Sequence, residues 1–183
     1  MTGVQTCALP IWTAHRLLGL KAITLIVDTL QRLQGTRLAV SISEYWFPFV
    51  ESLHVITMAV VAGTIFIVDT RLIGLTSTKL PFSYVSERLL PWTWGAFCCS
   101  VVTGTLMFIG NATGYYDNTA FRVKMALLLC AGLNMLFFQC VTFRGVSSWD
   151  SGRPPATARI AGILSVALWC GVIGFGRWIG FTA

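Results

Sequence analysis

The stretch WFPFVESLHVITMAVVAGTIFIV, residues 46–68, is an apolar run long enough to cross a lipid bilayer. A helix needs about 20 such residues to span the hydrocarbon layer. Three similar runs follow, at about residues 91–110, 125–143 and 157–181. Because these runs do not alternate between polar and apolar residues, they indicate helices and not the strands of a barrel. The sequence therefore predicts an all-α fold, an integral membrane four-helix bundle over residues 46–183.

The composition also indicates a membrane protein. Of the 183 residues, 55% are hydrophobic and 11% are charged, whereas soluble domains carry about 25% charged residues. The formal net charge is +6, but the basic residues are scattered between apolar runs and form no patch. The lipid bilayer is therefore the expected partner, and nucleic acid is not.

The basic residues between the runs predict an orientation. The connections 69–90 and 144–156 carry slightly more Arg and Lys than the opposite side does, provided that residues 12–27 are left out of the count. Since positively charged loops stay in the cytoplasm, both termini are expected on the periplasmic side of a bacterial inner membrane. Pro48 and Pro91 are expected near helix starts, where a missing N–H costs little.

The segment before the first run has two parts. Residues 1–11, MTGVQTCALPI, resemble a translated sequencing adapter, and we expect them to be a non-native artefact. Residues 12–45 are expected to lie at the membrane surface. Within them, leucine and isoleucine recur at near-helical spacing over residues 28–44, which predicts one or two short amphipathic helices. A plain tether is the alternative.

Ionisable residues within the apolar runs are costly enough in a bilayer to indicate function. On a helical wheel, Glu51, His54 and Asp69 share one face of the first run, which must point at other helices or at a water-filled cavity. Glu51 and Arg177 lie at a similar depth, some 6–8 Å below one surface at ~1.5 Å per residue. We expect these two to form an ion pair and to complete a polar cluster with His54 and Asp69. The alternative is that each side chain extends separately to the headgroups.

His54 is the candidate cofactor ligand. A b-type haem needs one or two axial ligands such as histidine or methionine, and Met58 and Met107 fall in the same half of the bilayer as His54. A haem held by His54 would have Arg177 near its propionates. A copper site using His54 and methionine is the less favoured metal site. Otherwise the imidazole is hydrogen-bonded within the bundle and the methionines are packing residues.

Gly176 and Gly180 form a G-x-x-x-G in the last run. Small residues at this spacing let two helices approach closely. The neighbour is expected to be the first run or a second copy of the chain. A homo-oligomer or a larger membrane complex is therefore a predicted partner.

Four stretches carry a resemblance to a known family. They are FVESLHVITMAVVAGTIFIVDTRLIGL, LLPWTWGAF, GYYDNTAFRVKMALLLCAGLNMLFF and FGRWIGF. Over about residues 28–181 the chain resembles a bacterial family of small four-helix inner-membrane proteins of unknown function. The resemblance implies the fold and location, and places in the family pattern Glu51, His54, Asp69, Arg71, Trp92, Trp94, Tyr116, Asn134 and Arg177. Some relatives have histidine at the position of Gln139, a departure that weakens any two-histidine cofactor site in this chain.

Three function classes are open at this point. The first is an interior polar site that binds b-type haem for electron transfer. The second is a small permease or proton-coupled subunit in which Glu51, His54 and Asp69 form a polar track. The third is a non-catalytic accessory subunit of a membrane complex. The chain contains no phosphate loop, nucleophile elbow or metalloprotease helix, so it is not expected to be an enzyme on its own.

Overall fold

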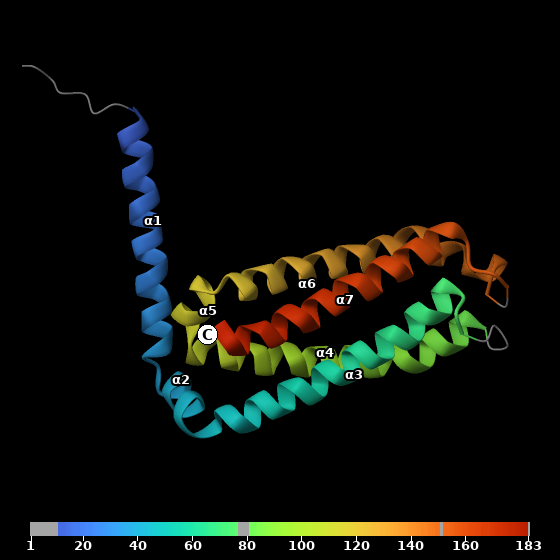
Figure 1. Ribbon diagram of the computed structural model, residues 1–183, viewed down its shortest axis with the longest axis horizontal. Helices are drawn as coiled ribbons and strands as arrows, with labels where there is room; N and C mark the ends of the chain where they lie inside the picture. Colours follow the sequence, from blue (N-terminus) through green and yellow to red (C-terminus); the bar gives the residue numbers. More distant parts are fainter. Residues whose placement is uncertain (1–10, 77–80, 151, 183) are drawn as a thin grey trace, which may run out of the picture.

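Four long helices dominate the computed structural model, which describes residues 11–76, 81–150 and 152–182, with side chains from residue 21 onward. They are α3 (Phe47–Ile73), α4 (Phe82–Gly110), α6 (Thr119–Phe137) and α7 (Ala156–Thr182), and they run alongside one another (Figure 1). These four helices, α3 and α6 with short helical extensions, are long and apolar enough to cross a membrane. The described ranges contain no strand. The prediction of an all-α protein with four membrane helices is confirmed.

The helices pack in the order α4, α3, α7, α6. α3 packs along both α4 and α7, and α7 packs along α6. Val61 of α3 packs with Trp169 and Val172 of α7 in one apolar core. α4 and α6 approach each other through side chains, such as Phe108 and Phe121, whose ring centroids lie 5.6 Å apart.

Large apolar side chains also cover the outside of the helices. Val55, Ile56, Leu129, Leu133 and Ile160 are each more than half exposed. An apolar surface of this extent is unfavourable in water, whereas lipid tails are as apolar as these side chains. The chain is therefore a membrane protein.

α4 begins nine residues before the predicted run. Pro91 consequently lies inside the helix, and the prediction that it marks a helix start is wrong. The helix begins at Phe82 because the Phe82 N–H donates to the Asp150 carbonyl at 3.0 Å and the Ser83 N–H donates to the Asp150 carboxylate at 2.7 Å. Pro48, by contrast, does lie in the first turn of α3.

The N-terminal segment contains a long helix, α1 (Ile11–Gln34). The prediction of only short helices over residues 28–44 is therefore wrong in length. α1 runs across the end of the bundle and not along it (Figure 1), and it contacts α5 (Ala112–Asp117) there. Its Ile23 and Leu25 side chains are more than half exposed. The expected artefact, residues 1–11, lies outside the described residues except for Ile11.

A short helical extension leads into α3. Thr36 caps α2 (Arg37–Ser41) by accepting a hydrogen bond from the Ala39 N–H at 3.3 Å. A π-helical segment, η1 (Ile42–Trp46), then continues into α3, so that residues 37–73 form one helical run. At the other end of the bundle, α6 extends through η2 (Phe138–Thr142) and η3 (Phe143–Ser148).

Candidate functional site

His54 lies in the second turn of α3, with its ring against α4. Its Nδ1 is 2.9 Å from Thr103 Oγ1, and a Cβ placed on Gly104 would lie 3.2 Å from His54 Cε1. The Thr103 hydroxyl also lies 2.8 Å from the Cys99 carbonyl, and a hydroxyl that donates its single hydrogen there accepts from His54 Nδ1–H. In that arrangement Nδ1 carries the hydrogen and Nε2 keeps a lone pair.

The contact between His54 and Thr103 is one of three polar contacts that join α3 to α4, which together we call the α3–α4 seam. The other two, each 2.8 Å long, run from Ser100 Oγ to Thr57 Oγ1 and from Thr93 Oγ1 to Thr64 Oγ1. Such contacts hold membrane helices together. Val61, which is fully buried, fills the interface between the second and third contacts. The hydroxyls therefore do not form a continuous chain.

Replacing Thr57 by valine tests the α3–α4 seam. We expect a loss of about 0.6 kcal/mol in unfolding free energy, because Ser100 Oγ loses its acceptor on α3. Thermal unfolding in detergent, followed by circular dichroism, measures the loss. Thr105→Val is the matched control, since the Thr105 hydroxyl bonds only to Val101 of its own helix. Equal melting temperatures for the two variants would show that the seam contributes nothing.

Lys124 of α6 is the member of the site that sequence reasoning missed. It is partly buried, and a Cβ on Gly176 of α7 would lie 3.5 Å from Lys124 Nζ. Lys124 is close enough to His54 for an electrostatic interaction, and none of the described carboxylates pairs with it. A cation inside a membrane bundle is expensive without a partner. The pair therefore suits an anionic group bound near His54.

The signal that could have revealed Lys124 is Asn118. Asparagine is a favoured N-cap residue, and the Asn118 side chain accepts a hydrogen bond from the Phe121 N–H at 3.2 Å. A helix that begins at Thr119 places Lys124 in its second turn. The third predicted run begins at residue 125, so Lys124 falls just outside it, in the connection before that run.

Glu51 and Arg177 do not form the predicted ion pair. The Arg177 guanidinium carbon lies 5.5 Å from the ring centroid of Phe181, one turn further along α7, and no ion pair between Arg177 and Glu51 occurs among the described residues. Both side chains are exposed. The prediction rested on depth, and equal depth does not fix the direction in which a side chain leaves its helix.

Tyr115 of α5 lies above the site at the end of the bundle. Its ring packs against Phe108 and Phe121, with centroid distances of 6.3 and 5.3 Å. Burial, and to a lesser degree the Glu51 carboxylate, raise the pKa of the Tyr115 phenol. The phenol is therefore a neutral hydrogen-bonding group at neutral pH, and Glu51 interacts with α5 and not with α7.

Asp69 lies far from His54. The two residues are 15 positions apart in one helix, which is about 22 Å at ~1.5 Å per residue. The Asp69 carboxyl is buried and interacts with the Ser165 hydroxyl of α7. Arg71, only 2% exposed, donates from Nη2 to the Asp150 carbonyl at 3.2 Å. The predicted polar cluster is therefore not formed, because His54 lies at one end of the bundle and Asp69 at the other.

The remaining candidate ligands are spread over the bundle. Met58 packs against the apolar core of Val61, Trp169 and Val172, and Met107 is partly buried in α4. Gln139, in η2, follows the start of α6 by 20 residues, or about 30 Å. This position and His54 lie at opposite ends of the bundle, so a histidine at 139 could not share one haem with His54. The described residues contain no group of three or more His, Cys, Asp or Glu that could hold a metal ion.

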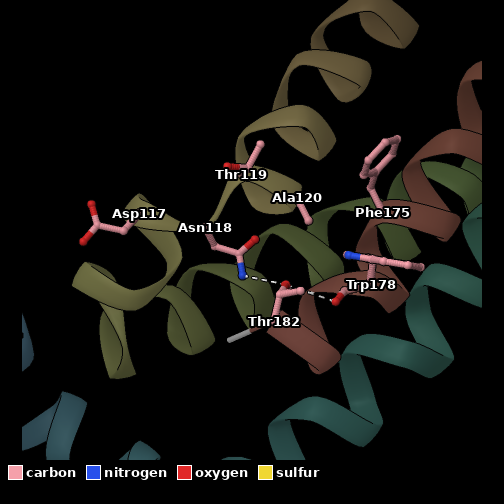
Figure 2. Close-up of a pocket in the computed structure, with 7 residues that line it drawn as sticks. All are labelled: Asp117, Asn118, Thr119, Ala120, Phe175, Trp178 and Thr182. Carbon is pink, nitrogen blue, oxygen red and sulfur yellow. Dashed lines mark hydrogen bonds between the residues drawn. The ribbon is translucent and has the colours of Figure 1, made fainter.

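Two surface cavities adjoin α7, and His54 lines neither of them. The larger, about 380 Å³, is lined by residues 117–120 at the α5–α6 junction and by Phe175, Trp178 and Thr182 (Figure 2). The smaller, about 230 Å³, is lined by Gly171, Gly174, Phe175 and Trp178. The sequence predicted neither cavity, because the larger depends on how α7 is rotated against α6 and the smaller on how Phe175 and Trp178 stand out from α7.

Comparison with known proteins identifies the family. The model of a family described as "Family of unknown function (DUF6644)" matches residues 39–182. No curated protein and no solved structure matches the chain. The matched range contains all four long helices together with His54 and Lys124. The chain therefore belongs to this family of unknown function.

Proposed function

We propose that this chain is a small inner-membrane protein whose site at His54 and Lys124 binds b-type haem for electron transfer. The contact between His54 Nδ1 and Thr103 Oγ1 carries the proposal. A histidine that ligates iron uses one ring nitrogen, while a hydrogen bond from the other fixes its orientation. His54 Nδ1 is held by Thr103 Oγ1 at 2.9 Å, which leaves Nε2 as the ligating atom. The haem, when bound, supplies one-electron chemistry, and the protein supplies position and charge.

The surroundings of His54 fit a haem in two respects. Lys124 provides a cation for a propionate carboxylate, the role predicted for Arg177. α4 and α6 approach through the flat rings of Phe108 and Phe121 and not through close backbone packing. Since His54 lines neither cavity, a haem would enter here by displacing side chains between α4 and α6.

The absorption spectrum tests this proposal. Protein expressed with an adequate haem supply is expected to show a Soret band, which shifts when dithionite reduces the iron. His54→Ala is expected to remove or shift the band. His15→Ala is the matched control, because His15 is the other of the two histidines in the chain. A wild-type protein without a Soret band, or a His54→Ala spectrum identical to wild type, would refute the assignment.

Proton-coupled transport is the second candidate, and the burial of Asp69 favours it. An ionisable group buried in a membrane helix commonly marks an ion or proton pathway. The proposed track would run along α3 from Glu51 past His54 to Asp69. Flux into liposomes should then fall in the Glu51→Gln variant. Equal flux for wild type and variant would count against this candidate.

The third candidate, an accessory subunit, rests on the glycines of α7. Lys124 covers Gly176, so the predicted small-residue face is occupied by α6 at that point. Gly180 faces open space and is exposed, which suits contact with a second copy or another membrane protein.

We also propose, from the loop charges, that both termini lie in the periplasm. Labelling of single cysteines with a membrane-impermeant reagent tests this orientation.

A further inference from the structure

We propose that α1 lies in the plane of the membrane surface and inserts one apolar face among the lipids beside the bundle. Figure 1 shows α1 crossing the end of the four-helix bundle and continuing beyond it, past α6. The four long helices are the ones long and apolar enough to cross the bilayer, so a helix that runs across their end lies at the level of the lipid headgroups. The proposal concerns the part of α1 that extends beyond the bundle.

The side of α1 that faces the bundle is marked by Leu30 and Gln34. Leu30 is only 9% exposed, and the Gln34 side-chain oxygen accepts a hydrogen bond from the Thr113 hydroxyl of α5 at 3.0 Å. Because Leu30 and Gln34 are four positions apart, they lie on the same side of the helix. We call this side the inner face of α1.

The inner face continues along α1 beyond its contact with the bundle. Ile26 and Ile23 precede Leu30 by four and seven positions, which places all three on one side of a helix. Ile26 is 41% exposed and Ile23 is 55% exposed, so the bundle leaves much of both side chains uncovered. The opposite side of α1 carries three exposed charged residues, Lys21, Asp28 and Arg32.

The direction and level of the inner face identify lipid as its occupant. Since α1 lies across the end of the bundle, the side that faces the bundle also faces the bilayer in which the bundle is embedded. Tyr45 and Trp46, 77% and 56% exposed, stand at this same end, directly before α3. Such aromatic side chains are typical of the membrane–water boundary. An apolar helix face directed inward at that level inserts between headgroups and acyl chains.

Leu25 provides an internal control for this assignment. It is 69% exposed and precedes Leu30 by five positions, which turns it to the outer side of α1. Leucine is as apolar as isoleucine. A difference between position 25 and positions 23 and 26 therefore reports the direction in which a side chain points and not its type.

Cysteine labelling of the full chain in lipid nanodiscs, where both membrane surfaces meet water, tests the proposal. The variants are Ile23→Cys, Ile26→Cys, Leu25→Cys and Asp28→Cys, and peptide mass spectrometry separates each new cysteine from the native ones. A water-soluble maleimide is expected to label positions 23 and 26 about ten-fold more slowly than positions 25 and 28, because lipid must be displaced from an apolar side chain before the reagent reaches it. Equal rates at the four positions would overturn the proposal.

A second measurement on the unmodified chain separates lipid from protein as the occupant. A phospholipid with a photoreactive diazirine near the top of its acyl chain is added to the nanodiscs and activated. Crosslinks are expected at Ile23 and Ile26, and not at Leu25. Slow maleimide labelling at positions 23 and 26 without lipid crosslinks there would also overturn the proposal, and would assign the inner face to a second copy of the chain or to another protein.

Discussion

Replacing Gly162 by leucine is expected to lower the free energy of unfolding by about 3 kcal/mol. Gly162 of α7 is buried against the end of α3, where a Cβ would lie 3.1 Å from Leu72 Cβ and 3.2 Å from the Asp69 carbonyl oxygen. A backbone carbonyl cannot rotate away as a side chain can, so a larger residue must push the two helices apart. The helices would then lose the packing that joins α3 to α7.

Melting curves in detergent measure this effect. A loss of that size corresponds to a fall of roughly 6–12 °C in melting temperature for a chain of this length. Gly174→Leu is the matched control, because it makes the same change on the same helix where nothing lies within 4 Å. Identical melting temperatures for the two variants would show that α7 does not approach α3 as closely as the structure has it.

Replacing Asp150 by alanine is expected to lower the free energy of unfolding by about 0.5–2 kcal/mol, the range of a lost helix cap. The Asp150 carboxylate accepts hydrogen bonds from the Ser83 N–H and the Ser83 hydroxyl, each 2.7 Å long. Alanine leaves both donors without this acceptor at the start of α4. Glu87→Ala removes an exposed carboxylate from the same helix and should change the melting temperature little.

The stabilisation that the Asp150 carboxylate gives the folded protein should disappear in acid. The Ser83 N–H and hydroxyl, with smaller effects of the Phe82 N–H and the Arg71 charge, hold the pKa of the Asp150 carboxyl below its usual value. A lowered folded-state pKa means that the stabilisation is complete above the unfolded pKa of about 3.9 and is lost as the pH falls through the folded value. The difference in melting temperature between wild type and Asp150→Asn should hold from pH 7 to 5 and shrink below about pH 4. A difference that grows in acid would contradict this account.

Apolar length was enough to predict the four membrane helices. α7, for example, begins and ends within one residue of its predicted run. The start of α4 could not be predicted, because Asp150, the residue that fixes it, is 67 positions from Ser83. Capping by residues close in sequence leaves a local pattern, and capping by a distant loop leaves none.

The candidate site was predicted only in part, because its geometry depends on how each helix is rotated. Sequence spacing gave the face of α3 that carries His54, but it wrongly paired Glu51 with Arg177 and did not place Lys124 near His54. It likewise indicated Gly176 and Gly180 as the close-packing glycines, whereas Gly162 is the one against which α3 packs most tightly. Rotation is set by the packing of all four helices together, and no single run encodes it.

The contact between Asp150 and the first turn of α4 also constrains how the protein is made. At about 5–20 residues per second, the ribosome adds the 67 residues that separate Ser83 from Asp150 in roughly 3–13 seconds. The rest of α4 is synthesised early in that interval, but its first turn lacks the Asp150 acceptor until the interval ends. The start of α4 therefore receives its acceptor only after α6, the third membrane helix, has been synthesised and before α7 has been. The order of translation thus sets when the α4 N-terminus can be completed.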